Sequence, residues 1–165
     1  MESVELVTSP PEYEDFYRRE YPAMVALAAA VSGSFAAAED LAQEALTRAF
    51  RRWGRISTYD RPGAWLRRVT INLALSRRRR LASEARLRLR LGGPPLVELP
   101  EGDETHVWIA VRRLPARQRA AIALYYLEDR SVAEIADILG CSEATIRVHL
   151  HRGRTKLATM LEHDP

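Results

Sequence analysis

Glycine and proline residues near the middle of the chain divide its 165 residues into two parts. The runs Gly92-Gly93-Pro94-Pro95 and Pro100-Glu101-Gly102-Asp103 lie close together, and regular helices and strands do not continue through such runs. The residues on either side have the apolar spacing of amphipathic helices. The chain is therefore expected to form two small domains, each with a modest hydrophobic core.

Each part is predicted to consist of helices alone, which makes the fold class all-α. In the first part the predicted helices cover residues 13–32, 36–53 and 62–81, with a loop at 54–61. In the second part they begin near residues 105, 115, 131 and 142. We expect an N-terminal domain of three helices over 10–81, a flexible linker over 82–104 and a C-terminal domain of four helices over 105–162.

The predicted linker includes an alternating run, Arg86-Leu87-Arg88-Leu89-Arg90-Leu91, which has the period of a strand but no partner strand in the sequence. The other interpretation is a lid over an active site inside a single domain. That interpretation is less favoured, because long loops without structure are uncommon in compact domains. A relaxed linker of this length spans only about 25–30 Å, so the two domains are expected to lie close together in the free protein.

Charge is distributed unevenly, although 25 basic and 22 acidic residues leave a formal net charge of only +3. Residues 1–44 have a net charge of −7, residues 45–100 of +11 and residues 101–165 of −1. Every basic residue except Lys156 is an arginine, which suits bidentate contacts with phosphate and guanine. The basic middle indicates a polyanionic partner, although an arginine-rich genome and segregated solvated helix faces are simpler interpretations of the same pattern.

Several classes of protein are excluded by simple features. No apolar run approaches the roughly 20 residues of a membrane-spanning helix, and the N-terminal residues lack the basic and apolar regions of a secretory signal. The single cysteine, Cys141, cannot form an internal disulfide or a two-cysteine zinc site. His149 and His151 would point about 200° apart on a helix and could not share a metal. We expect a cytoplasmic protein with no metal, no cofactor and no insertion into a membrane.

The clearest motif lies in the C-terminal part. Ser131-Val132-Ala133-Glu134 has the Ser-x-x-Glu pattern of a capping box, which opens a helix. Ala136 is small where two helices would cross, and Gly140 allows a tight turn. Ser142 can cap the next helix, and Ile146 would fill the space between the two. These offsets predict a helix-turn-helix, with a plain helical hairpin as the less specific interpretation.

The second helix of this motif is predicted to have one buried and one exposed face. At 100° per residue, the buried face comprises Ile146, Leu150, Gly153, Leu157, Met160 and Leu161. The opposite face comprises Ala144, Arg147, Val148, His151, Arg152 and Thr155. A guanidinium, an imidazole and small groups on one face can read base edges in a major groove, while Arg154 and Lys156 at the flanks suit phosphates.

These motifs resemble one family, the bacterial RNA polymerase sigma factors, and in particular its small extracytoplasmic-function branch (sigma-70-like, group IV). Residues 114–157 are similar to the domain that reads the promoter −35 element. Residues 38–50 are similar to the polymerase-binding helix of the family, and residues 62–75 to the helix that reads the −10 element. The resemblance extends over roughly 13–80 and 105–160, with the motifs in the family's order.

The resemblance implies a role for three groups of residues. The residues that would bind the β′ clamp helices of core RNA polymerase are Asp40, Gln43, Glu44, Arg48 and Arg51. The residues near the loop that captures an unstacked −10 base are Tyr59, Trp65, Arg68, Asn72 and Arg77. The −35 contacts would come from Ser142, Glu143, Ala144, Thr145, Arg147, Val148, His151, Arg152, Arg154 and Lys156.

The resemblance also implies what the whole protein does. It would be an initiation factor and not an enzyme, with core polymerase (including the β flap), promoter DNA and an anti-sigma protein as partners. One residue departs from the family pattern, because Ser76 stands where the family often has aspartate. That departure leaves open which polar group partners the basic run 77–80.

Two other functions remain open on sequence grounds. The segment 145–150 also resembles the recognition helix of response-regulator and quorum-sensing transcription factors, but such a regulator needs a sensory domain. Residues 1–100 show no alternation of strands and helices from which one could be built. A helical nucleic-acid enzyme would need clustered carboxylates for metal ions, whereas the acidic residues here are spread along the helices.

Overall fold

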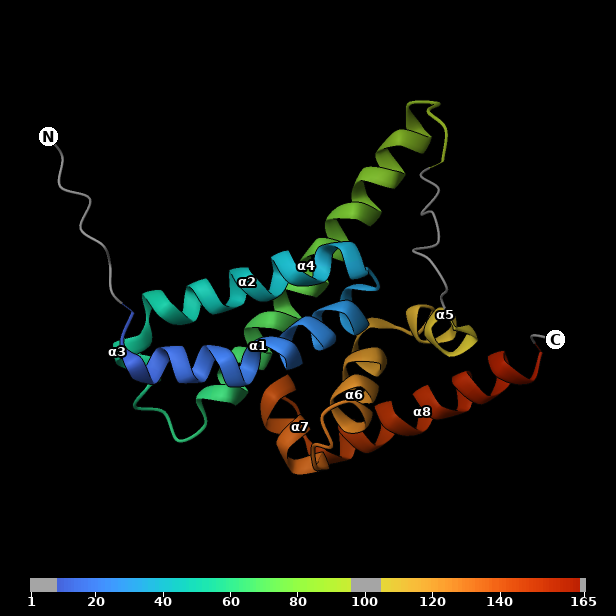
Figure 1. Ribbon diagram of the computed structural model, residues 1–165. Helices are drawn as coiled ribbons and strands as arrows, with labels where there is room; N and C mark the ends of the chain where they lie inside the picture. The colour runs from blue at the N-terminus through green and yellow to red at the C-terminus, as the bar shows by residue number, and fades with distance from the viewer. Residues whose placement is uncertain (1–8, 96–104, 164–165) are drawn as a thin grey trace, which may run out of the picture.

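The computed structural model describes residues 9–95 and 105–163, and helices are the regular elements of these ranges (Figure 1). The helices are α1 (Pro11–Ser32), α2 (Phe35–Arg51), α3 (Trp53–Ile56), α4 (Pro62–Arg90), α5 (His106–Arg112), α6 (Ala116–Tyr126), α7 (Val132–Leu139) and α8 (Glu143–Glu162). No strand occurs in the described ranges, which confirms the predicted fold class.

Local signals set most of the helix boundaries in the N-terminal part. Pro11 and Pro62 lie in the first turns of α1 and α4, where a backbone N–H would have no acceptor within the helix, so the N–H that proline lacks is not missed. The side chain of Ser34 caps α2 by accepting a hydrogen bond from the N–H of Ala37. Gly33, at φ 74°, ends α1 in the left-handed region that favours glycine.

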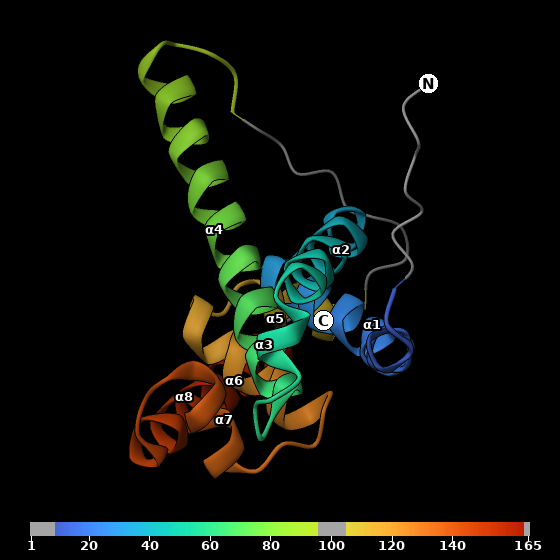
Figure 2. The same cartoon turned by 90° about the vertical axis from the view of Figure 1, so that its left-hand side faces the viewer.

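Helices α1 and α2 form an antiparallel pair, and α4 packs against both (Figures 1 and 2). Alanine makes up much of the buried surface of this pair, at positions 28, 29, 30, 38, 42, 45 and 49. Such small side chains let the helix axes approach closely, and Met24, Leu27 and Leu46 fill the remaining space. The hydroxyl of Tyr13 donates to the Leu46 carbonyl at 2.8 Å and ties the start of α1 to α2.

The structure corrects the predicted loop at 54–61, because its first residues belong to the short helix α3. The ring of Trp53 lies 5.4 Å from that of Tyr13 and 5.0 Å from that of Phe16. Ile56 is fully buried. This one-turn helix therefore depends on packing against α1, which a local sequence pattern does not reveal.

Helix α4 continues to Arg90 and not to about residue 81, so the predicted linker was wrong over residues 82–90. The alternating run is helical because arginine and leucine are good helix formers and neither glycine nor proline interrupts the chain before Gly92. Its second half projects away from the rest of the protein (Figure 1). The connection between α4 and α5 comprises residues 91–105, and a chain of that length reaches at most about 50 Å. Of this connection, 96–104 lie outside the described residues.

In the C-terminal part the four predicted helices are present, and the local predictions for the helix-turn-helix are confirmed. The capping box of α7 has both of its bonds: Glu134 N–H donates to Ser131 Oγ at 3.1 Å, and Ser131 N–H donates to Glu134 Oε2 at 2.8 Å. Gly140, at φ 66°, ends α7. The side chain of Ser142 caps α8 by accepting from Thr145 N–H at 3.1 Å.

The two parts of the chain pack directly against each other. Helix α1 contacts α5 and α6, and α4 contacts α7 (Figure 2). Buried apolar side chains of both parts belong to one continuous core. None of the described helices is both long enough and apolar enough to cross a membrane.

Close packing between α6 and α8 generates a first prediction. A Cβ atom on Gly153 would lie 2.9 Å from Cγ1 and 3.2 Å from Cδ1 of Ile122. Gly153→Val should therefore lower the free energy of unfolding by about 1–3 kcal/mol, measured by denaturant titration. Gly54→Ala is the control, since no atom lies within 4 Å of its Cβ position, and it should change stability by less than about 1 kcal/mol. Equal stability of the two variants would contradict the tight crossing.

Candidate nucleic-acid interface

The predicted reading face of α8 is open to solvent. Its exposed members are Ser142, Glu143, Ala144, Arg147, Val148, His151, Arg152, Arg154, Thr155 and Lys156, and Thr145 is half-buried. On the opposite face Ile146, Leu150 and Gly153 are buried, as predicted, whereas Leu161 in the last turn is 38% exposed. The structure therefore brings the predicted −35 residues together on one accessible helix.

The guanidinium groups of Arg147 and Arg154 on this helix differ in their surroundings. Arg147 makes an exposed ion pair with Glu143 at 3.1 Å, and such pairs contribute little to stability. Arg154 donates to the Tyr126 hydroxyl at 2.7 Å and lies 5.0 Å from the centre of the Tyr125 ring. The hydrogen bond to Tyr126 raises the pKa of Arg154. Arg147 can thus exchange its partner for a base edge easily, while Arg154 is held in a fixed position at the flank.

His149 lies between the two faces of α8 and is half-buried. Burial lowers the pKa of its imidazole, and the nearby Arg117 and Arg152 lower it further. The lowered pKa favours the neutral form of His149, so this residue adds little positive charge to the surface at neutral pH.

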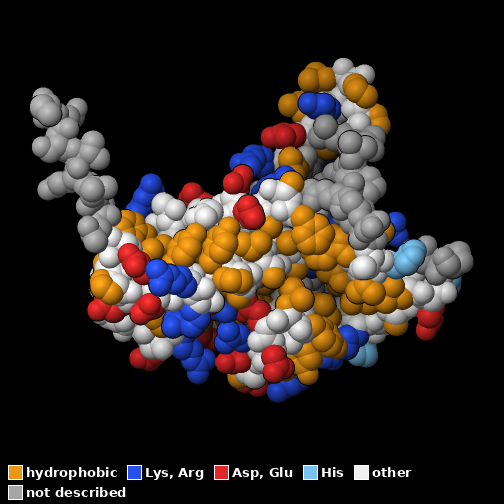
Figure 3. All heavy atoms as spheres, viewed as in Figure 1, with side chains coloured by type: hydrophobic (Ala, Val, Ile, Leu, Met, Phe, Trp, Pro, Cys, Tyr) orange, Lys and Arg blue, Asp and Glu red, His pale blue; other side chains and the backbone are white. Residues whose placement is uncertain are grey.

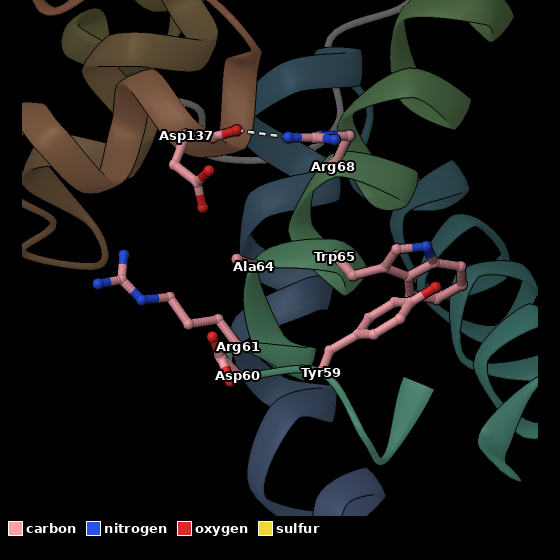
Figure 4. Close-up of a pocket in the computed structure, with 7 residues that line it drawn as sticks. All are labelled: Tyr59, Asp60, Arg61, Ala64, Trp65, Arg68 and Asp137. Carbon is pink, nitrogen blue, oxygen red and sulfur yellow. Dashed lines mark hydrogen bonds between the residues drawn. The ribbon is translucent and has the colours of Figure 1, made fainter. Parts of the chain in front are cut away.

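A second candidate site is a cavity of about 690 Å³ beside the start of α4 (Figure 4). It is lined by Tyr59, Asp60, Arg61, Ala64, Trp65, Arg68 and Asp137. Tyr59 comes from the loop before α4, and Trp65 and Arg68 from the first turns of that helix. Three of the five predicted −10 residues therefore share one cavity, with aromatic and basic groups suited to a base and its phosphate.

The other two predicted −10 residues lie elsewhere on α4. Asn72 is exposed one turn beyond Arg68, and it lines a smaller cavity of about 220 Å³ together with Leu139 and Gly140 of the helix-turn-helix. Arg77 is half-buried and lines neither cavity. The predicted group is thus divided along the helix by the approach of α7.

Arg68 is already bound within the protein. Its Nε donates to the carbonyl of Ile138 at 3.1 Å and its Nη2 to that of Asp137 at 2.5 Å, as the dashed line in Figure 4 marks for the second bond. These carbonyls lie in the last turn of α7, where the helix dipole favours a cation. Sequence reasoning did not find this contact, because the residues are about 70 positions apart.

The predicted polymerase-binding residues line one side of α2. Asp40, Gln43, Glu44, Arg48 and Arg51 are all exposed. Arg48 Nε and Glu44 Oε1 form an ion pair at 2.9 Å. This side of α2 is a charged, accessible surface, while the alanine side of the same helix is buried.

Two tyrosines that the sequence did not single out extend this surface onto α1. Gln43 Nε2 donates to the Tyr17 hydroxyl at 2.9 Å. The rings of Tyr17 and Tyr21 are stacked, with centroids 5.3 Å apart. The two tyrosines lie four residues apart on α1, and both are half-buried.

Hydrophobic side chains also gather on the face seen in Figure 3, near the meeting of α1, α5 and α6. A cavity of about 450 Å³ lies there, lined by Ala30, Thr105, Val107, Trp108, Val111, Ile122, Ala123, Tyr126, Leu127 and Leu157. Val107, Tyr126 and Leu127 are each more than half exposed. Phe35, half exposed, stacks on Trp108 with centroids 4.4 Å apart and extends this apolar groove onto α2.

Comparison with known proteins matches the two parts of the chain separately. Residues 16–84 match the family described as sigma-70 region 2, and residues 109–157 match sigma-70 region 4. The RNA polymerase sigma-E factor of Streptomyces avermitilis is 30% identical over 92% of this chain and 86% of its own length. The ECF RNA polymerase sigma factor SigM of Mycobacterium tuberculosis is 29% identical over 90% of this chain and 76% of its own length.

Solved structures of two other proteins are also similar to this chain. The sigma factor RpoE of Bartonella quintana, crystallised with the anti-sigma factor NepR, aligns with a TM-score of 0.76 and 25% identity over 94% of this chain and all of that one. CnrH, solved with the cytosolic domain of CnrY, aligns with a TM-score of 0.65 and 24% identity over 93% of this chain and 89% of that one, which shows a shared fold.

The cap of α8 generates a second prediction. Ser142→Ala removes the acceptor for the Thr145 N–H and should lower the free energy of unfolding by about 1 kcal/mol, measured by thermal or denaturant unfolding. Ser142→Asp keeps an acceptor at the same position and should retain most of that stability. If both variants lose the same stability, the cap is not what Ser142 contributes.

Proposed function

Since this chain belongs to the extracytoplasmic-function branch of the sigma-70 family, we propose that it binds core RNA polymerase and directs it to promoters with two separate DNA-reading surfaces. The observation that carries the proposal is the order of the two matched regions in one chain, each with an accessible polar helix face. A response-regulator or quorum-sensing regulator is not favoured, because the first part matches sigma-70 region 2, where such a regulator would have a sensory domain.

Helix α8 supports the upstream part of this proposal. Its exposed face contains Arg147, Val148 and His151 around the first two turns, where a recognition helix contacts base edges in the major groove. Arg154 and Lys156 lie at its flank, toward phosphates. This domain would read the −35 element and meet the β flap of the polymerase.

The cavity at the start of α4 supports the downstream part. Removing a base from the stack costs a few kcal/mol, and stacking on an aromatic side chain can offset that cost. Tyr59 and Trp65 provide such rings, and Arg68 provides a cation beside them. We assign capture of an unstacked −10 base to this cavity, with Asn72 and Arg77 as neighbouring DNA contacts on α4.

The apolar groove supports an anti-sigma partner. The solved relatives RpoE and CnrH are complexes with NepR and CnrY. In this chain the groove lies against both parts, since Ala30 belongs to α1 and Trp108 and Tyr126 to the C-terminal helices. An amphipathic helix of an anti-sigma protein would bury its apolar side there.

The remaining properties follow from this role. Bond-making chemistry belongs to the polymerase, so the chain acts without catalysing a reaction of its own. Transcription takes place in the cytoplasm, and that is where we place the protein. Run-off transcription with core polymerase tests the whole proposal. The purified chain should make initiation promoter-specific. Core enzyme that stays inactive on every promoter offered, including that of the chain's own gene, would count against the proposal.

The charged side of α2 generates a prediction about polymerase binding. A Gln43→Ala, Glu44→Ala, Arg48→Ala triple variant should bind core polymerase more weakly by at least about 2 kcal/mol, or roughly thirtyfold in affinity. The reason is that it removes charge-assisted contacts at the proposed interface. Pull-down and fluorescence titration with core enzyme measure the loss. A Glu12→Ala, Glu14→Ala variant on exposed positions of α1 is the control. Full binding by the folded triple variant would disprove the assignment.

Helix α8 generates a prediction about base reading. Arg147→Ala should cost about 1–3 kcal/mol and relax the preference at one promoter position, most simply a guanine. Arg154→Ala should instead weaken binding to all promoters alike, because it removes a phosphate contact. Binding to a set of −35 variants at fixed salt concentration separates the two. An equal loss on all sequences for Arg147→Ala would show that it does not contact a base.

A further inference from the structure

A buried ion cluster lies where the two parts of the chain meet. The guanidinium of Arg67 on α4 contacts Glu20 Oε2 on α1 at 3.0 Å and also pairs with Glu128 in the loop between α6 and α7. The three side chains are only 5%, 12% and 6% exposed. Arg67 also donates to the Gly63 carbonyl at 2.9 Å. One cation of the N-terminal part is thus held by carboxylates from both parts.

The loop that provides Glu128 is held in position by its own contacts. Asp129 has a left-handed backbone with φ 52°, and the N–H of Arg130 donates to the Leu124 carbonyl at 3.1 Å. The guanidinium of Arg130 lies 3.5 Å from Glu128 and 3.8 Å from Glu134. The loop therefore presents Glu128 toward Arg67 in one defined position, and loss of either side chain in the closed protein would leave the other as a buried charge with one partner fewer.

Closure of this junction places α7 over part of the proposed −10 surface. Arg68, next to Arg67, is bound to the last carbonyls of α7, and Asn72 faces the turn at Leu139 and Gly140. These bonds use two of the five N–H groups of Arg68 and hold its guanidinium against the end of α7, so a DNA strand could reach this part of α4 only where α7 leaves it open. The reading face of α8, by contrast, remains open in the same arrangement.

We propose that Glu20, Arg67 and Glu128 form a latch that keeps the free protein closed, with α7 covering the part of α4 that binds single-stranded DNA. This inference rests on the proposed function for the role of Arg68 and Asn72. The apparent affinity of a site that exists only in the open form is reduced by the fraction of molecules that are open. Opening would follow when the polymerase binds the two parts at separate places.

The test uses the full chain with Glu128→Gln, which removes one carboxylate of the latch and leaves the Arg67–Glu20 pair. Small-angle X-ray scattering should show a larger radius of gyration than for the unaltered protein. Fluorescence anisotropy with a labelled pool of random 20-nucleotide single-stranded DNA should show at least tenfold tighter binding. Glu14→Gln is the matched control, because it makes the same charge change at an exposed ion pair on α1 and should alter neither measurement.

Two further variants make the outcome specific. Glu128→Asp keeps the charge but withdraws it from Arg67, so it should open the protein as well and serves if Glu128→Gln does not fold. Adding Asn72→Ala to Glu128→Gln should abolish the gain in DNA binding without closing the protein. An unchanged radius of gyration in both folded Glu128 variants would overturn the latch. Expansion without tighter DNA binding would overturn the covering of the DNA site, while run-off transcription tests the sigma-factor role separately.

Discussion

A single buried arginine connects the two halves of this protein where they meet. Removing the guanidinium of Arg67 from water is unfavourable unless carboxylates replace the lost hydration, and Glu20 and Glu128 do so from opposite sides of the junction. Loss of one partner of a buried pair typically costs about 3–5 kcal/mol. The apolar contacts of α1 with α6 and of α4 with α7 close around this cluster, so charge and packing favour the same arrangement.

The three proposed functional surfaces differ in how accessible this arrangement leaves them. The polar side of α2 and the reading face of α8 are accessible, whereas the middle of α4 lies against α7. The proposed polymerase contact through α2 would therefore require no prior change in the protein. Under the proposed latch, full use of the −10 surface requires the two halves to move apart, and a connection of the length of 91–105 can span tens of ångströms.

Predictions that depended on neighbouring residues agreed with the structure. The capping box at Ser131, the left-handed turn at Gly140 and the cap at Ser142 each involve atoms within four residues along the chain. Predictions that depended on the absence of a helical pattern agreed less well with the structure. The run of alternating arginine and leucine was assigned to a linker, yet it is helical because helix propensity acts wherever glycine and proline are absent. Helix α3 needed the distant ring of Tyr13.

The sequence by itself determined the helical fold class, the family, the helix-turn-helix and which residues lie on the exposed face of α8, because these follow from short-range spacing and from the types of side chain. Only the tertiary structure decided that Arg67 is a buried junction residue and that Arg68 binds the end of α7. The physical reason is that both contacts join residues more than 60 positions apart, and an arginine in a basic helix gives no local sign of whether its partner will be a carboxylate, a carbonyl or DNA.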